Sequence, residues 1–294
     1  MPIVVTLAVT ILVTGDDVVV NGISKGVYVN APLAMVVLEV RFPSEASAAP
    51  VTVSLQRAFR DRLVAHGDWI IEAQQVRKVE VEFGSNLTQS VQTQIVPRLL
   101  TRDRTMSVSL PPGAITIETT RYDGYDEFRG LVETVLAAAN ELLNPDGVVR
   151  FGMRYIDEIQ VPQHGEGDLS AWANWLLPPL LPPQLPESIS TGSRIETWAS
   201  AAQYRFGADR FMIVRYGPQP LPVVHATTPL RRLNPPPQVP VFVIDFDSYW
   251  QPEAVPAFDR ENLIGICDLL HEPASDSFEA FITPALRDVF RGEA

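Results

Sequence analysis

Residues 106–120, MSVSLPPGAITIETT, contain the turn that decides the fold. Two short strands, predicted at 106–110 and 114–120, flank the sequence Pro111-Pro112-Gly113. Proline sets φ early in a turn and glycine tolerates positive φ late in it, so this stretch predicts a tight hairpin. Strands that are joined by so short a turn pair in the antiparallel direction. The stretch therefore predicts an antiparallel sheet.

Further strands and two helices are expected around this hairpin. Apolar and alternating patterns predict strands at 33–42, 76–83 and 91–100. A helix with an apolar stripe follows Pro50, and a second helix is expected to begin near Asp123, whose carboxylate can cap free amide groups. The first half of the chain thus reads strand, helix, several strands, helix.

The second half repeats that order of elements. Asp259 and Thr283 are expected to cap two closing helices, and His271 is expected to end the first of them just before Pro273. The remaining elements are a long strand at 148–161, a short helix at 169–177, and strands at 194–206, 211–216 and 239–246. The predicted class is α+β, with a mainly antiparallel sheet, helices on one side and two similar halves.

The domain boundaries follow from these elements. Residues 31–147 form the first half and residues 148–294 the second, with residues 1–30 as an N-terminal hairpin or extension. The apolar run at 3–13 is too short to span a bilayer and has no basic segment before it, so no membrane association is expected.

Composition limits the class of partner. Apolar residues make up 46% of the chain, charged residues 20%, and the formal net charge is −12, with the larger acidic excess in the second half. This charge repels phosphate backbones, which disfavours an extended nucleic-acid groove. The one basic cluster, Arg98, Arg102 and Arg104, is interpreted as a solvated turn. The single cysteine, Cys267, excludes internal disulfides and favours a reducing compartment, so a cytoplasmic location is predicted.

A polar cluster is expected in the centre of the sheet. The long strand carries Arg154, Tyr155, Asp157 and Glu158. An unpaired buried charge is costly, so an arginine there needs carboxylate partners, and Arg41 with Glu39 lies on the corresponding strand of the first half. One interpretation is a network of ion pairs between strands. The alternative is a site on the open face of the sheet that binds an anionic ligand or a partner chain through Arg41 and Arg154.

Asp245 and Asp247 form a second candidate at the end of an apolar strand. Side chains two residues apart on a strand share a face, so both carboxylates could bind a divalent cation. The alternative is that they cap loops or meet arginines. No glycine-rich phosphate loop accompanies them and the histidines form no ligand pair, so neither a cofactor nor a metal site is predicted.

Tryptophans and prolines are concentrated in the second half. Trp172 and Trp175 are three apart on one helical face, a spacing typical of a core or of a protein interface. The proline-rich stretches 178–186 and 218–240 favour stiff loops that wrap the surface of the domain, and a ligand for a proline-reading module is the alternative.

Five local patterns together resemble a sporadically distributed bacterial family of uncharacterised proteins. The patterns are Ala31-Pro32-Leu33 with Leu38-Glu39-Val40-Arg41-Phe42, Tyr122-Asp123-Gly124-Tyr125 with Phe128, Gly152-Met153-Arg154-Tyr155-Ile156-Asp157, Asp245-Phe246-Asp247, and Leu270-His271 with Phe278 and Ile282-Thr283. The resemblance covers residues 30–292, and the family usually has Asn at the position of Asp157. It implies no activity, but a patchy distribution resembles that of toxin–antitoxin and phage-defence genes.

These observations favour a non-enzymatic protein that binds another protein, in a defence or toxin–antitoxin module. An alternative is an enzyme or receptor that binds a small ligand, nucleotide or metal at the face around Arg154 and Asp245. Another alternative is a structural subunit that associates with itself through the tryptophan-rich half, as a homo-oligomer.

Overall fold

The computed structural model describes residues 28–43, 51–83, 87–161, 169–182, 186, 195–224 and 230–293. For residues 74–83, 87–95 and 169–170 only the backbone is described. The hairpin or extension predicted for residues 1–30 therefore lies almost wholly outside the described residues.

The described strands form one nine-stranded sheet in which every pairing is antiparallel, in the order β2-β3-β4-β5-β1-β6-β9-β8-β7. The strands are β1 (Leu33–Arg41), β2 (Trp69–Phe83), β3 (Leu87–Thr101), β4 (Met106–Ser109), β5 (Ala114–Thr119), β6 (Arg150–Ile159), β7 (Ser200–Phe206), β8 (Arg210–Gln219) and β9 (Val241–Trp250). The predicted hairpin is β4–β5, and the predicted α+β class is confirmed.

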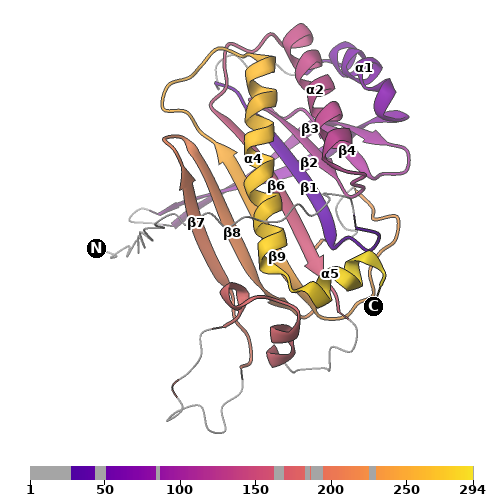
Figure 1. The fold of residues 1–294 in the computed structure, drawn as a ribbon. Helices are drawn as coiled ribbons and strands as arrows, with labels where there is room; N and C mark the ends of the chain where they lie inside the picture. Colours follow the sequence, from indigo (N-terminus) through magenta and orange to yellow (C-terminus); the bar gives the residue numbers. More distant parts are fainter. Residues whose placement is uncertain are drawn as a thin grey trace.

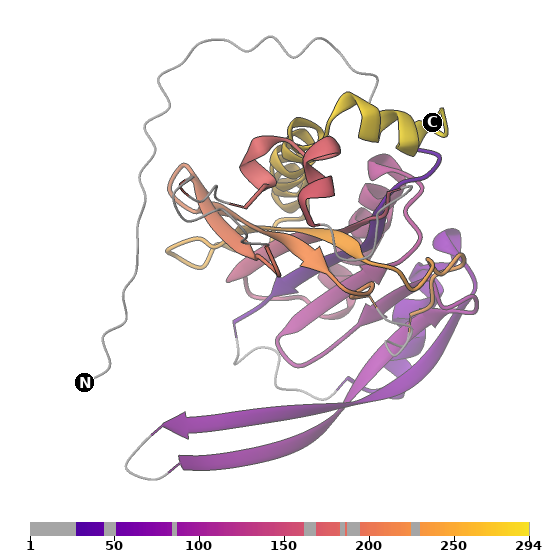
Figure 2. The same cartoon turned by 90° about the horizontal axis from the view of Figure 1, so that it is seen from below.

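The helices pack on one face of this sheet (Figures 1 and 2). They are α1 (Val53–Arg62), α2 (Tyr125–Leu142), α4 (Arg260–Phe281) and α5 (Pro284–Arg291), with the short 3₁₀ helices η1 (Val64–His66), η2 (Leu169–Asn174) and η3 (Pro178–Leu180). Alternate strand residues such as Leu38, Phe151 and Phe246 meet Leu136 of α2 and Cys267 of α4 in one apolar core. We call this side of the sheet the helix face.

The strand order relates the two halves of the chain. β1 and β6, the first strands of each half, pair with one another at the centre. The last strand of each half, β5 or β9, pairs with the first strand of its own half. A helix, α2 or α4, then follows each last strand and crosses the sheet (Figure 1). The halves therefore share one sheet and one core.

Helix boundaries depart from the sequence patterns in two places. Asp123 does not cap α2: the N-cap is Gly124, and the Asp123 carboxylate accepts a 2.7 Å bond from Arg121 Nε instead. The first closing helix does not end at His271 but continues through Pro273. Proline removes the bond to the carbonyl of Leu269, which lies on the exposed side of the helix, where water can replace it. The predicted caps Asp259 and Thr283 are confirmed.

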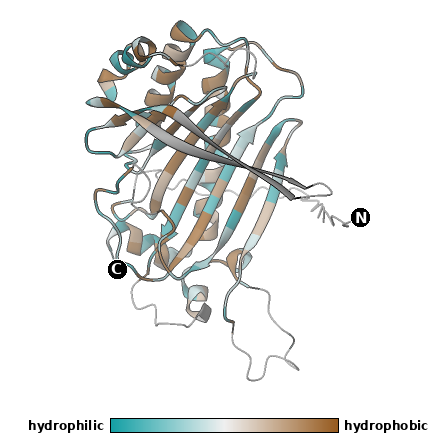
Figure 3. Ribbon diagram, turned by 180° about the vertical axis from the view of Figure 1, so that it is seen from behind, coloured by the Kyte–Doolittle hydropathy of each residue, from teal (hydrophilic) through white to brown (hydrophobic). Residues whose placement is uncertain are grey.

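β2 and β3 are longer than their sequence patterns indicated. Only Arg98, Leu99 and Leu100 of β3 pair with β4, so most of the β2–β3 ribbon is paired only with itself. Figures 2 and 3 show that this ribbon projects on the side of the sheet away from the helices.

Loop residues cover part of that second side, and we call residues 221–224 and 230–240 the strap. Glu158 of β6, whose side chain is fully buried, accepts 2.7 Å bonds from the amides of Val223 and Val224 and pairs with Arg232. Leu230 of the strap packs against Met35 of β1 and Leu100 of β3. Beyond β8, the described residues of the proline-rich stretch 218–240 thus form a loop on the surface of their own domain, at the end of the sheet where Glu158 lies.

Candidate functional site

The side of the sheet that the helices leave open carries a network of arginines and carboxylates. We call it the arginine face. Its members are Glu39 and Arg41 on β1, Arg150 and Arg154 on β6, Arg215 on β8, and Asp245 and Asp247 on β9. Their strands are neighbours in the sheet although they are far apart in the sequence.

Arg154 and Asp245 form the best-defined pair of this network. Arg154 donates from Nε to one carboxylate oxygen at 2.6 Å and from Nη2 to the other at 2.8 Å. These two parallel bonds fix the plane of the guanidinium and raise the pKa of Arg154. Asp245 lies near the middle of β9 rather than at its end, because β9 extends to Trp250.

The network continues in both directions from this pair. Arg215 Nη1 lies 3.4 Å from the Asp245 carboxylate and 3.8 Å from that of Asp247. Arg150 bridges Asp247, at 3.4 Å, and Glu39, at 3.1 Å.

Arg41 ends the chain of pairs. Its Nε lies 2.6 Å from the Glu39 carboxylate. The inter-strand ion pairs of the first interpretation are therefore present, and they lie on the side of the sheet away from the helices. Ligand or partner binding through Arg41 and Arg154 stays a prediction.

The arginines lie outside and the carboxylates beneath them. The side chains of Arg154 and Arg215 are each 45% exposed, whereas that of Asp245 is 8% exposed. Within this network, four arginines stand against three carboxylates. Approaching solutes therefore meet positive charge on a protein whose formal net charge is −12.

Two aromatic rings border the network. Tyr249 of β9 and Phe211 of β8 stack with centroids 5.2 Å apart, and the guanidinium of Arg150 lies 4.7 Å above the Tyr249 ring. Gly152 makes this possible, because a Cβ atom there would lie 2.7 Å from Arg150 Nη1.

The arrangement is suited to binding an anionic group. Arg154 engages Asp245 through Nε and Nη2, and within the described residues its Nη1 has no hydrogen-bond partner that would prevent it from donating outward. The carboxylates hold the guanidinium planes in place before a ligand arrives, which lowers the entropy lost on binding. Asp245 and Asp247 meet arginines, which favours that alternative over a metal site for the pair.

Tyr155 and Asp157 lie on the opposite side of β6 from Arg154, since side chains alternate along a strand. The Tyr155 hydroxyl shares a 2.8 Å hydrogen bond with His271 Nδ1, and the His271 ring stacks on Tyr125 at 3.7 Å. Burial raises the pKa of Tyr155. These residues therefore do not share a site with the arginine face.

Polar groups around Tyr155 join α2 to α4. The Tyr125 hydroxyl donates to Asp268 at 2.7 Å, and Arg129 donates to the same carboxylate at 2.8 Å. Burial opposes ionisation of Asp268, but the bonds from Arg129 and Tyr125 lower its pKa overall. Burial raises the pKa of Cys267, beside them in the core, to about 12, so this thiol is inert at neutral pH. The cluster is a polar connection between the helices and the sheet.

A Tyr155→Phe substitution tests this structural role. It removes the hydroxyl that bonds His271 and keeps the ring, so we expect the free energy of unfolding to fall by about 1–2 kcal/mol. Chemical denaturation measures the loss. Ligand binding at the arginine face should not change, because Arg154 points away from this ring; a binding defect would contradict the separation of the two clusters.

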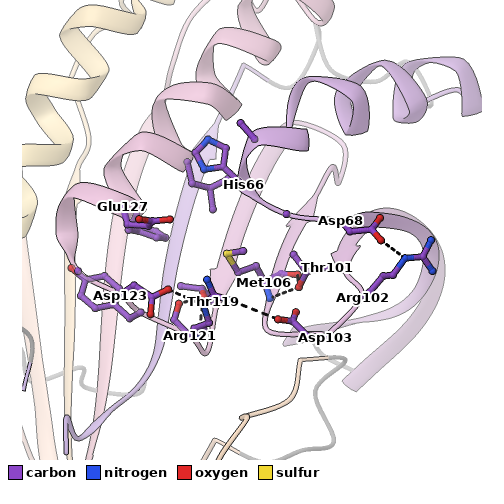
Figure 4. Close-up of a pocket in the computed structure, with 16 residues that line it drawn as sticks. His66, Asp68, Thr101, Arg102, Asp103, Met106, Thr119, Arg121, Asp123 and Glu127 are labelled. Carbon is purple, nitrogen blue, oxygen red and sulfur yellow. Dashed lines mark hydrogen bonds and ion pairs between the residues drawn. The ribbon is translucent and has the colours of Figure 1, made fainter. Parts of the chain in front are cut away.

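A cavity of about 460 Å³ lies between η1, α2 and the ends of β3–β5 (Figure 4). Most of its charged side chains pair with one another: Asp68 with Arg102, and Arg121 with both Asp103 and Asp123. The Arg98–Arg104 cluster predicted to be a solvated turn is likewise neutralised, and Arg98 itself is buried against Glu118. This cavity therefore lacks the outward-facing arginines, held by buried carboxylates, that distinguish the arginine face.

The two candidate interface tryptophans belong to the core. Trp172 is fully buried against Phe242, and Trp175 is partly buried against the same cluster. Of the two interpretations of their spacing, core packing describes Trp172. A self-association surface would need other residues.

Sequence reasoning overlooked Arg150, Arg215, Phe211 and Tyr249. Phe211, Ile213 and Arg215 are spaced two residues apart on a predicted strand, and this spacing predicts that their side chains share one face. Which face this is depends on the strand order, which local sequence does not contain.

The five sequence patterns converge on β6. Glu39, Arg154 and Asp245 come from three of them and meet on the arginine face. Tyr125 and His271 come from the other two and meet Tyr155 on the helix face. The five patterns therefore contribute residues to two clusters, one on each side of a single strand.

Comparison with known proteins adds no further constraint. No protein-family model matches the sequence, and no curated protein matches it. Among the described residues, no helix has the length and apolar content needed to cross a bilayer. Within the same residues, no three histidine, cysteine, aspartate or glutamate side chains gather as metal ligands.

Proposed function

We propose that this protein is a non-enzymatic binding protein whose arginine face takes up an acidic, extended segment of a partner protein. The observation that carries the proposal is the difference in exposure between the two signs of charge: Arg154 and Arg215 are half-exposed, whereas the carboxylate of Asp245, which they contact, is buried. Arginine and tyrosine are the residues that most often anchor protein interfaces, and Tyr249 borders the same face.

A protein partner fits the charge of the molecule better than a nucleic acid. Charges interact over about 8–10 Å at physiological salt, so the arginines act at contact range. A long phosphate backbone would extend beyond them over a surface with net charge −12. A short acidic segment requires only the local patch.

The proposed setting is a bacterial defence or toxin–antitoxin module, in which this protein neutralises or senses its partner. The support for it is the resemblance carried by the five patterns. The proposed compartment is the cytoplasm, and the support is the use of one cysteine, which is buried and unmodified by any disulfide.

A second candidate function is a receptor or enzyme for a small anionic ligand. The bidentate geometry of Arg154 suits a carboxylate or a phosphate equally well. The side chains of Arg154 and Arg215 are half-exposed rather than enclosed, which favours an extended partner over a small molecule.

The test uses a synthetic peptide of alternating glutamate and threonine, as long as β7. We expect the double variant Arg154→Ala/Arg215→Ala to bind it at least tenfold more weakly than the original protein, because charge-assisted hydrogen bonds contribute about 1.5–3 kcal/mol each. Fluorescence anisotropy measures Kd. Raising the salt concentration should weaken binding to the original protein and leave the double variant almost unaffected.

The matched control replaces two arginines elsewhere. Arg60 and Arg62 lie on α1 and form exposed ion pairs with Asp61 and Glu141. The variant Arg60→Ala/Arg62→Ala should retain full affinity, and a peptide with glutamine in place of glutamate should bind to neither protein. Equal affinity of the double variant and the original protein would show that the arginine face is not the binding site.

A further inference from the structure

The arginine face reaches an edge of the sheet at β7. Among the described strands β7 is the last, and most of its side chains are exposed. An edge strand offers a row of backbone N–H and C=O groups to a further chain. The row of paired residues Asp245, Arg215 and Ala201 leads from the network to this edge.

A hollow of about 390 Å³ lies between this edge and the network. Small residues such as Ser200 and Ala201 line one side of it, and Arg215 and Asp245 line the other. Gly217 contributes to its shape, because a Cβ atom there would lie 2.6 Å from the Trp198 carbonyl oxygen and would push that segment away. The hollow therefore gives Arg215 access to the edge of the sheet.

We infer that the acidic partner segment binds as an additional antiparallel or parallel strand on β7, with one carboxylate side chain reaching across Ala201 to Arg215. This inference rests on the proposed function and specifies how the partner is held. Neighbouring strands lie about 4.8 Å apart, so an added strand would run roughly 10 Å from β8. A glutamate and an arginine side chain together span that distance, and Ala201 is too short to block them.

Charge favours a partner protein over a second copy of this chain. The exposed residues of β7 include Arg205, whose guanidinium lies over Phe211, and none of the seven residues of β7 is acidic. Two copies of β7 would bring no carboxylate to Arg215. An acidic strand supplies both the backbone groups and the negative charge.

Backbone hydrogen exchange tests the inference separately from binding. In the full-length protein saturated with the glutamate–threonine peptide, we expect amides of β7 that point outward to exchange at least tenfold more slowly than in the free protein. Ala201→Trp, which fills the hollow and removes no charge, should weaken binding at least tenfold. Ala254→Trp, at an exposed loop position, is the matched control and should bind normally.

Three results would overturn the inference in distinguishable ways. Binding that needs Arg154 and Arg215 but leaves β7 exchange and the Ala201→Trp variant unchanged would disprove strand addition and leave the proposed function standing. Protection of β7 in the protein alone, lost on dilution, would assign this edge to a second copy. No affinity for the acidic peptide would overturn the proposed function and the inference together.

Discussion

Glu158→Ala is expected to lower the free energy of unfolding by about 3–5 kcal/mol, the largest loss predicted for a single side chain outside the apolar core. The Glu158 carboxylate is fully buried and holds the strap through Arg232 and the amides of Val223 and Val224. Its removal leaves one buried positive charge and two amide donors without an acceptor. Chemical denaturation measures the loss, and hydrogen exchange should show faster exchange of both strap amides.

Two further variants identify the cause. Glu158→Ala/Arg232→Met should recover part of the stability, since it removes the uncompensated guanidinium. Glu39→Ala removes a carboxylate from the same side of the sheet, but this one is partly exposed and should cost about 1 kcal/mol or less. A loss below about 1 kcal/mol for Glu158→Ala would mean that the strap is not held by this residue.

Asp157→Asn is expected to stabilise the protein, by about 2–4 kcal/mol at pH 8. Burial, followed by the negative charge of Asp245 on the neighbouring strand, raises the pKa of Asp157 from 3.8 to about 8. Folding therefore opposes ionisation of this carboxyl, and asparagine has the same shape without that cost.

The effect of Asp157 on the free energy of unfolding depends on pH. The folded protein keeps Asp157 protonated up to about pH 8, whereas in the unfolded chain the group ionises near its ordinary pKa of 3.8. The folded state thus binds more protons between these values, so the contribution of Asp157 to stability is full below pH 4 and is lost as the pH rises through 8. The Asn variant should lack this decline.

Thermal or chemical unfolding at pH 4, 6 and 8 measures the difference. The gain from Asp157→Asn should be near zero at the lowest pH and largest at the highest. Asp268→Asn is the control with the opposite sign, since bonds from Arg129 and Tyr125 lower the pKa of Asp268, and this variant should destabilise the protein most at neutral pH. A gain that is independent of pH would contradict the explanation.

These predictions distinguish the two sides of β6. Arg154 faces outward, whereas Tyr155 and Asp157 face the helices, where they affect stability. Variants at Arg154 should change binding with little effect on folding. Variants at Tyr155 and Asp157 should do the reverse.

Local sequence was sufficient for the features that depend on near neighbours in the chain. The Pro111-Pro112-Gly113 turn, the caps Asp259 and Thr283, and the shared face of Asp245 and Asp247 follow from backbone preferences and from the two-residue period of a strand. Local patterns misplaced the start of α2, where Gly124 rather than Asp123 is the N-cap. They also misplaced the end of α4, which continues through Pro273 because the carbonyl that loses its partner lies on the exposed side of the helix.

The tertiary structure was needed wherever partners lie far apart in the chain. Arg154 and Asp245 are 91 residues apart, and Glu158 and Arg232 are 74 apart. Strand order brings these pairs together, and it is set by packing of the whole apolar core rather than by any short segment. That order also places Arg154 on the open side of the sheet, β7 at its edge and Trp172 in its core.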